Sequence, residues 1–300
     1  MKVAYLILAH DTPNHMKRLI QALDSPNAAF VVHVDRKSDI TPFRQGVSKP
    51  NVSFVEDRLP VYWGEFPVVE ATIRLIEEGL KHDPDYLCLL SGSDYPLRSP
   101  AYIENFFRQH RGSEFINLVQ LPDERVYKRI GRVTEYWVQT PLNNPLVRRM
   151  VKRLNELNRR LGLRRDYTKA LAGLVPYAGS MWWALTADAC RYILEFSTAR
   201  PELVRFMRNV PIPDESFFQI VIGNSEFAKR VNRNLTYTDW TRPEHAPARI
   251  DMEHLRDFLK GEAVIGDDYY GRGELLFARK FSDDSSQLTE IIDEQLLRRA

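Results

Sequence analysis

The sequence predicts an α/β protein with a central, mostly parallel sheet flanked by helices. Three observations support this fold class. Predicted strands alternate with predicted helices through the first half of the chain, which is typical of parallel sheets. The first strands are continuously apolar, as strands buried on both faces are. Polar motifs follow directly after two of these strands, where the ligand sites of such sheets lie.

The elements of the first half follow from the spacing of apolar residues. We expect strands over 2–9, 29–34, 52–56 and 86–90, and helices over 12–24 and 65–80. Pro13 lies in the first turn of the first helix, a position that tolerates proline. The run 3–9 lacks the small-residue cleavage site of a secretory signal, so we interpret it as a buried strand.

The second half is less regular. We expect a strand over 115–119, a helix over 146–161 and an extended segment over 176–186. Asp188 is the predicted cap of a helix over 189–196. A short helix over 214–223 carries Asp214 and Glu215 in its first turn, and an amphipathic helix over 286–299 ends the chain. No Pro, Gly or Ser-rich linker separates the halves, so residues 1–300 are interpreted as one domain.

Composition excludes several classes of protein. The net charge of +2 gives no basis for nucleic-acid binding. Cys88 and Cys190 lie in apolar contexts and are predicted to be buried thiols rather than a disulfide or zinc ligands. No apolar run reaches the roughly 18–20 residues that span a bilayer, so we expect a cytoplasmic protein.

Asp214 and Glu215, in the segment PIPDESFFQ, are the strongest local signal for catalysis. Prolines precede them and Phe217 and Phe218 follow, so carboxylates would lie beside an aromatic wall. Apolar surroundings raise the pKa of a carboxyl group towards neutrality, which suits a general base. The alternative is that two acids in a first helical turn only complement the helix dipole.

A second candidate site combines one carboxylate with two cations. Asp94 follows the strand 86–90 in the loop SGSDYP, but Gly92 stands where a D-x-D metal clamp would have its other acid. Arg279 and Lys280 follow an apolar stretch, and adjacent cations can form charge-assisted bonds to a diphosphate. The alternative for this pair is a solvated surface.

Seven motifs in order resemble glycosyltransferase family 14, which contains the core-2/I-branching β-1,6-N-acetylglucosaminyltransferases and the peptide O-xylosyltransferases. They are HVDRKS (33–38), VYWGEFPVVEAT (61–72), LLSGSDYPL (89–97), GSMWWAL (179–185), PDESFFQ (213–219), YTDW (237–240) and FARKF (277–281). PDESFF and FARKF are closer to the xylosyltransferases. The resemblance implies a GT-A-like nucleotide-sugar-binding fold in a soluble, bacterial-type member, with residues 1–120 binding the nucleotide sugar and 121–300 binding the acceptor and carrying catalysis.

The resemblance also implies a metal-independent, inverting transfer from a UDP-sugar, with Glu215 as the base and no cofactor. Asp214 would lie on the acceptor side. The predicted donor-binding residues are Asp35, Lys37, Trp63, Gly64, Asp94, Arg249, Arg279 and Lys280. The predicted sugar-stacking residues are Trp182, Trp183 and Trp240, for which core packing is the alternative.

Two other functions stay open at this point. One is a metal-dependent transferase or nucleotide-sugar hydrolase that uses Asp94, Asp214 and Glu215 as ligands. The other is a non-catalytic UDP-sugar-binding module. The animal members carry a membrane anchor and a cysteine-rich lumenal domain that this sequence does not show, so the acceptor is expected to differ; we consider carbohydrate, lipid-linked and peptide acceptors.

Residues 146–165, LVRRMVKRLNELNRRLGLRR, combine apolar residues at helical spacing with many basic ones. Such a helix can lie on an anionic membrane surface, which predicts peripheral membrane contact. The alternative is a helix with its apolar face on the core and its charges in water.

Overall fold

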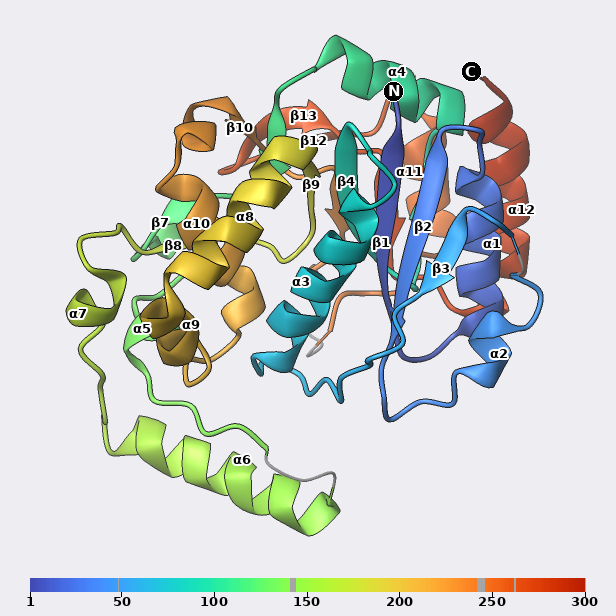
Figure 1. The fold of residues 1–300 in the computed structure, drawn as a ribbon. Helices are drawn as coiled ribbons and strands as arrows, with labels where there is room; N and C mark the ends of the chain where they lie inside the picture. Colours follow the sequence, from blue (N-terminus) through green and yellow to red (C-terminus); the bar gives the residue numbers. More distant parts are fainter. Residues whose placement is uncertain (48, 141–143, 242–245, 262, 300) are drawn as a thin grey trace.

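A seven-stranded sheet forms the centre of the computed structural model, which describes residues 1–300 except 48, 141–143, 242–245, 262 and 300 (Figure 1). Its strand order is β10-β6-β9-β4-β1-β2-β3. All neighbouring pairs are parallel except those that involve β9, which runs antiparallel to β4 and β6. The predicted α/β architecture with a mostly parallel sheet is confirmed.

The strands of this sheet are β1 (Val3–Ala9), β2 (Ala28–Val34), β3 (Val52–Phe54), β4 (Tyr86–Ser91), β6 (Glu114–Ile116), β9 (Trp183–Thr186) and β10 (Val231–Asn232). A second sheet has the order β11-β14-β5 and consists of β5 (Asp94–Pro96), β11 (Thr236–Thr238) and β14 (Phe277–Arg279). Two small two-stranded sheets contain β7 (Val119–Gln120) with β8 (Tyr177–Ala178), and β12 (Ile265–Asp268) with β13 (Gly271–Glu274).

The α-helices are α1 (Pro13–Leu23), α2 (Thr41–Arg44), α3 (Pro67–Leu80), α4 (Pro100–Gln109), α5 (Gly131–Thr134), α6 (Pro145–Arg160), α7 (Thr168–Leu171), α8 (Ala187–Ala199), α9 (Pro201–Met207), α10 (Phe217–Gly223), α11 (Met252–Leu259) and α12 (Ser286–Gln295). Short 3₁₀ turns are η1 (Glu124–Val126), η2 (Pro213–Glu215), η3 (Glu226–Arg230), η4 (Asp283–Ser285) and η5 (Leu297–Arg299).

The main sheet separates two hydrophobic cores, because side chains alternate along each strand. On β1, Tyr5 and Ile7 pack with helices α1, α4, α11 and α12, whereas Ala4 and Leu6 pack with α3, α8, α9 and α10. Both sets are almost completely buried. This two-sided burial explains why the strand is continuously apolar in sequence.

Several predicted boundaries need correction. Thr186, not Asp188, caps α8: its hydroxyl accepts a hydrogen bond from the Ala189 amide at 3.2 Å. The expected strand over 115–119 is split into β6 and β7, and the extended segment over 176–186 into β8 and β9. The helix expected over 214–223 is interrupted at Ser216 between η2 and α10, and the last helix ends at Gln295 before η5.

Other expectations agree with the structure. Cys88 and Cys190 are buried free thiols, as predicted. In the part of the chain that the structure describes, no helix combines the length and apolarity that a membrane crossing requires.

Helix α6 lies apart from both cores, at the end of the molecule opposite α4 (Figure 1). The alternative in which its apolar face packs on the core is wrong. Leu146 and Met150 are 71% and 69% exposed, while the fully buried residues of the helix are Asn155 and Asn158.

Candidate active site

The predicted polar motifs of the first half meet at the carboxyl edge of the main sheet. Because β1, β2 and β4 are parallel, the segments that leave them start at the same edge. Backbone hydrogen bonds join these segments: the Asp35 amide donates to the Ala9 carbonyl at 2.7 Å, and the Gly92 amide donates to the Leu8 carbonyl at 2.8 Å. The topology therefore brings Asp35 and the loop before Asp94 to one place.

Asp94 and Arg279 form a buried ion pair at this edge. Antiparallel pairing of β5 with β14 places the two residues opposite each other, with Arg279 Nε 3.1 Å from Asp94 Oδ1. Burial raises the pKa of Asp94 to about 6, against the lowering effect of the Arg279 charge. The guanidinium also stacks on the ring of Trp182, 4.1 Å from its centroid. Asp94 is thus already engaged by a cation of the protein.

Lys280, next to this pair, has no direct partner: within the described residues its ammonium group forms neither a hydrogen bond nor an ion pair. Burial lowers its pKa, and the Arg279 charge lowers it further, whereas the Asp11 and Asp94 carboxylates act in the opposite direction. Arg249 is exposed and comes to Lys280 because the Ile250 amide donates to the Lys280 carbonyl at 2.8 Å. Arg279 and Lys280 both act on the buried Asp94 carboxylate, and the exposed Arg249 adds a weaker positive charge beside Lys280.

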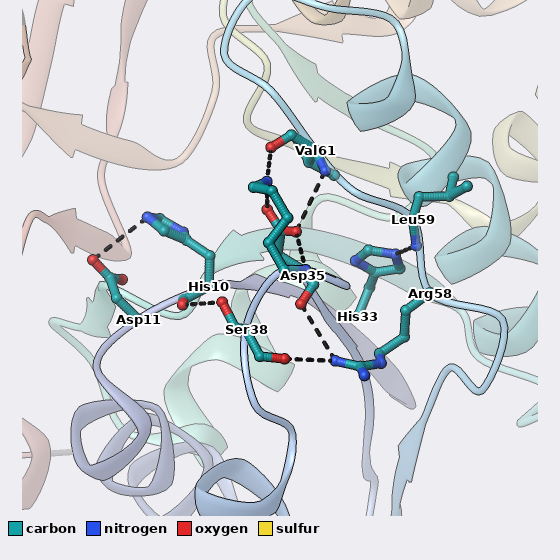
Figure 2. Close-up of polar contacts among 9 residues, drawn as sticks. His10, Asp11, His33, Asp35, Ser38, Arg58, Leu59 and Val61 are labelled. Atoms are coloured by element: carbon teal, nitrogen blue, oxygen red, sulfur yellow. Dashed lines mark hydrogen bonds and ion pairs between the residues drawn. The ribbon is translucent and has the colours of Figure 1, made fainter. Parts of the chain in front are cut away.

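Asp35 (Figure 2) lies at the same edge, and its carboxylate is bonded to the Lys37 ammonium. The Asp35 carboxylate also accepts hydrogen bonds from the backbone amides of Lys37 at 2.9 Å and Val61 at 3.4 Å. The Lys37 ammonium binds the Val61 carbonyl and lies 4.5 Å from the centre of the Tyr62 ring. These bonds fix the segment that leads from Val61 to Trp63 and Gly64.

His33 supports the same segment from the interior. It is 1% exposed, and its Nε2 accepts a hydrogen bond from the Leu59 amide at 3.0 Å (Figure 2). Burial lowers the pKa of His33 to about 4, so the ring is neutral at physiological pH. A neutral ring is what this acceptor role requires.

Gly64 connects the donor-side loop to the predicted catalytic turn. Its carbonyl accepts a hydrogen bond from the Ile212 amide at 3.1 Å, immediately before Pro213. Gly64 has a φ of 73°, a region that favours glycine, and a Cβ there would lie 3.5 Å from Ile212 Cγ1. This hydrogen bond links the loop at Gly64 to the start of η2.

Glu215 is held at the end of η2 by two cations that the sequence did not reveal. Its Oε2 lies 2.5 Å from Lys128 Nζ and 2.8 Å from Arg132 Nη2. The Glu215 side chain remains 25% exposed, so it is accessible from solvent. Lys128 and Arg132 come from the segment around η1 and α5, and no local pattern links them to a residue more than 80 positions away.

Asp214, unlike the accessible Glu215, is buried. It is 9% exposed, and its Oδ1 has no hydrogen-bond partner among the described residues. Burial raises the pKa of Asp214 to about 7, and the adjacent Glu215 charge adds to this effect. The predicted pair is thus one reachable carboxylate and one buried carboxyl group with a near-neutral pKa.

The segment 179–182 joins the two clusters of charges. The Gly179 amide donates to the Glu215 carbonyl at 2.9 Å, and Gln219 Nε2 donates to the Ser180 carbonyl at 2.6 Å. Three residues after Gly179, Trp182 lies under the Arg279 guanidinium. A Cβ on Gly179 would lie 1.7 Å from the Asn117 carbonyl oxygen, so the close approach needs glycine.

The predicted sugar-stacking tryptophans are in different environments. Trp183 is 3% exposed and packs against Phe218 in the core, so its indole has no free face. Trp182 is covered by Arg279. Trp63 and Trp240 are 78% and 64% exposed and have free ring area.

Tyr270, at the tip of the β12–β13 hairpin, is a further residue near Glu215 that the sequence did not indicate. Burial raises the pKa of its phenol, and the Glu215 charge is the next largest cause. The hairpin therefore carries a half-buried tyrosine whose phenol lies within electrostatic range of Glu215. Among the described residues there is no cluster of three His, Cys, Asp or Glu side chains that could hold a metal ion.

Comparison with known proteins identifies related sequences. The family model described as "Branch: Core-2/I-Branching enzyme" matches residues 3–259. Human xylosyltransferase 2 is 25% identical over 320 residues, which cover 98% of this chain and 33% of that protein. Human N-acetyllactosaminide beta-1,6-N-acetylglucosaminyl-transferase is 24% identical over 302 residues, covering 96% of this chain and 70% of that protein.

The chain spans about a third of the length of the xylosyltransferases that it matches. Among solved structures, glucosyl-3-phosphoglycerate synthase from Mycobacterium tuberculosis superposes with a TM-score of 0.36 at 14% identity, covering 94% of this chain and 91% of that one. A likeness this low carries no argument about the site.

Proposed function

The chain belongs to the Core-2/I-branching enzyme family of glycosyltransferases, and from that premise we propose that it transfers a sugar from a UDP-sugar to an acceptor hydroxyl. The proposed reaction inverts the anomeric centre, needs no metal ion and uses Glu215 as the general base. The donor site is GT-A-like, at the carboxyl edge of the main sheet. The names of the relatives favour xylose or N-acetylglucosamine as the sugar.

One observation carries this proposal: a cation cluster in which Lys280 has no direct partner in the described part of the chain, and an accessible carboxylate, are joined by the short segment 179–182. Lys280 has no partner among the described residues and lies beside Arg279 and Arg249. Positive charge fixed in place stabilises the negative charge that develops on a departing diphosphate. Glu215 is the carboxylate that solvent, and hence an acceptor, can reach.

In the proposed mechanism, Glu215 accepts the proton of the acceptor hydroxyl while the hydroxyl oxygen attacks the anomeric carbon of the sugar. The bond from that carbon to the diphosphate breaks on the opposite face, and UDP leaves with the bond electrons. Arg279, Lys280 and Arg249 stabilise the new charge on UDP. A single displacement of this kind inverts the anomeric centre.

Asp214 is the other candidate base, because its pKa of about 7 suits proton transfer at physiological pH. The accessibility of the two side chains argues against Asp214 as the base. A base must come within hydrogen-bond reach of the proton that it removes, and the buried Asp214 side chain is much less accessible than that of Glu215. We assign Asp214 a positioning role at the acceptor side, where its neutral form leaves the negative charge on Glu215.

The partners that we propose are a UDP-sugar donor and an acceptor that is a carbohydrate, a peptide or a lipid-linked molecule. Peripheral membrane contact through residues 146–165 belongs to the same proposal. Its support is the exposed apolar surface of α6.

The proposal is tested by UDP release from UDP-xylose, UDP-N-acetylglucosamine, UDP-glucose and UDP-galactose in the presence of EDTA. Turnover of one donor that persists in EDTA and is lost in Glu215→Gln supports the assignment. Release that needs manganese would mean that a metal, not the cation cluster, balances the diphosphate. UDP binding without turnover of any donor, unchanged in Glu215→Gln, would indicate a binding module instead.

A further inference from the structure

Helix α6 presents an unpartnered apolar stripe to solvent. Its members recur at three- and four-residue spacing, so they fall within about 80° of one another around the helix. They are Leu146, Met150, Leu154, Leu157 and, one residue past the helix end, Leu161, with exposed fractions of 71%, 69%, 43%, 49% and 63%. Leu163, 48% exposed, continues the apolar surface beyond the helix.

A helix that only covers the core would bury its leucines and expose its polar residues. Here the buried residues of α6 are two asparagines. Asn155 pairs with the backbone of Val138 in both directions, accepting from its amide at 2.8 Å and donating to its carbonyl at 2.9 Å. The helix is thus attached through amide hydrogen bonds, and these leave the leucine stripe uncovered.

Basic residues occupy the remaining arc of the helix. The exposed members of this basic arc are Arg148, Arg149, Lys152, Arg153, Arg159 and Arg160. Glu156 is the sole acidic residue in the sequence 145–165, and its carboxylate pairs with Arg160. The surface of α6 therefore combines apolar area with a strong excess of positive charge.

We propose that α6 docks the protein on an anionic lipid bilayer, with the leucine stripe inserted at the headgroup boundary and the basic arc among the lipid phosphates. A protein partner or a second copy would match the stripe alone. The basic arc needs an extended negative surface as well, and a bilayer with anionic lipids supplies both.

Docking through α6 brings the candidate active site to the bilayer. The Arg148 guanidinium lies 5.2 Å from the centre of the Tyr62 ring, which is next to the exposed Trp63. Gly64 in the same loop is bonded to Ile212 beside the catalytic turn. Resting on the proposed transferase function, this placement favours an acceptor whose hydroxyl is carried at a membrane surface by a lipid.

The first test measures which side of α6 enters the bilayer. The native cysteines are buried, so single cysteines introduced as Met150→Cys and Lys152→Cys can be labelled with an environment-sensitive fluorophore. The two positions lie about 160° apart on one helix. With vesicles of phosphatidylglycerol and phosphatidylcholine, the label at 150 should shift to shorter wavelength and the label at 152 much less. Equal shifts, or none, would overturn the proposed orientation.

The second test measures vesicle affinity by sedimentation of the full chain at low salt. Arg149→Gln/Lys152→Gln/Arg153→Gln should weaken binding to anionic vesicles by about 100-fold. Leu146→Gln/Met150→Gln/Leu157→Gln should also abolish stable binding. The matched control Arg108→Gln/Arg111→Gln/Lys229→Gln removes three exposed charges remote from α6 and should bind like the parent protein.

Failure of the parent protein to bind anionic vesicles would overturn the proposal. So would a dimer in solution that the leucine-stripe variant dissociates, because the stripe would then be a protein interface. UDP release without vesicles is a separate readout. Both α6 variants should retain UDP release. If the parent protein itself releases no UDP, that result counts against the transferase function and not against membrane docking.

Discussion

The donor-side cluster and the catalytic turn both combine carboxylates with cations, yet they are balanced differently. Around Asp94, Arg279 forms the direct ion pair and Lys280 lies nearby without a hydrogen bond or ion pair among the described residues. Around Glu215, two cations bind one carboxylate directly while Asp214 has a pKa near neutrality. In the proposed mechanism the first arrangement binds the diphosphate and the second orients the base. Under that proposal, position within the fold, rather than residue type, gives the same chemical groups different functions.

The largest expected effect distinguishes the roles of Glu215 and Asp214, the two carboxyl groups of η2. Glu215→Gln should lower kcat by about 10²–10⁴-fold, because the variant cannot accept the acceptor proton. UDP affinity, measured by calorimetry, should stay within about twofold, since the cation cluster is unchanged. Asp214→Asn should keep most of the activity. A larger loss in Asp214→Asn than in Glu215→Gln would mean that the base is the buried group.

A matched pair of lysine variants compares the two clusters directly. Lys280→Met should weaken UDP binding by about 10–100-fold, as expected for the loss of one charge-assisted bond to an anion. Lys128→Met should leave UDP affinity within about twofold and lower kcat, because Glu215 loses part of its fixed orientation. If both variants changed UDP affinity equally, the two clusters would not have separate roles.

The protonation of Asp214 predicts how stability depends on pH. Its pKa is about 7 in the folded state against 3.8 for an unperturbed aspartate, so over this pH range the folded chain keeps a proton that the unfolded chain has lost. The contribution of Asp214 to the free energy of unfolding therefore falls as pH rises from about 4 to about 7. Asp214→Asn removes this dependence. In urea unfolding, its stability relative to the parent protein should rise by about 2 kcal/mol between pH 5 and pH 8. An unchanged difference would place the Asp214 carboxyl in a more polar environment than described.

The smallest effect tests the link between the two regions. Gly64→Ala should destabilise the fold by about 1 kcal/mol, because an L residue is strained at a φ of 73°. It should also lower kcat a few-fold, since Gly64 is bonded to the residue before Pro213. Gly162→Ala is the control: φ is 65°, no atom lies within 4 Å of the added Cβ, and the position is remote from Glu215 in sequence. Equal kcat values for both variants would show that the link does not act on catalysis.

The sequence predicted those parts of the fold that depend on local pattern. The apolar run of β1 and the helical spacing of α3 both report burial, so these elements were found near their true bounds. The cap of α8 was misplaced because Thr186 and Asp188 are both good capping residues, and only the backbone at Thr186 decides between them. Asp94, Arg279, Lys280 and Arg249 were assigned to one donor site through the family resemblance.

Other features depend on contacts between distant segments and left no local signal. Lys128 and Arg132 look like any surface cations until the fold brings them to Glu215. The sequence also could not predict which face of α6 is exposed to solvent. An apolar stripe indicates a face that avoids water but does not say whether the protein itself covers that face.

The late position of β14 has a consequence for synthesis of the chain. Six of the seven strands of the main sheet, and the loop that carries Asp94, precede residue 187, whereas Arg279 and Lys280 lie near the end of the sequence. A nascent chain can therefore form most of its central sheet on the ribosome before Arg279 and Lys280 have been synthesised. During this period Asp94 has no ion-pair partner. Under the proposed function, UDP binding should begin only once the segment that carries β14 has left the exit tunnel and added its strand between β5 and β11.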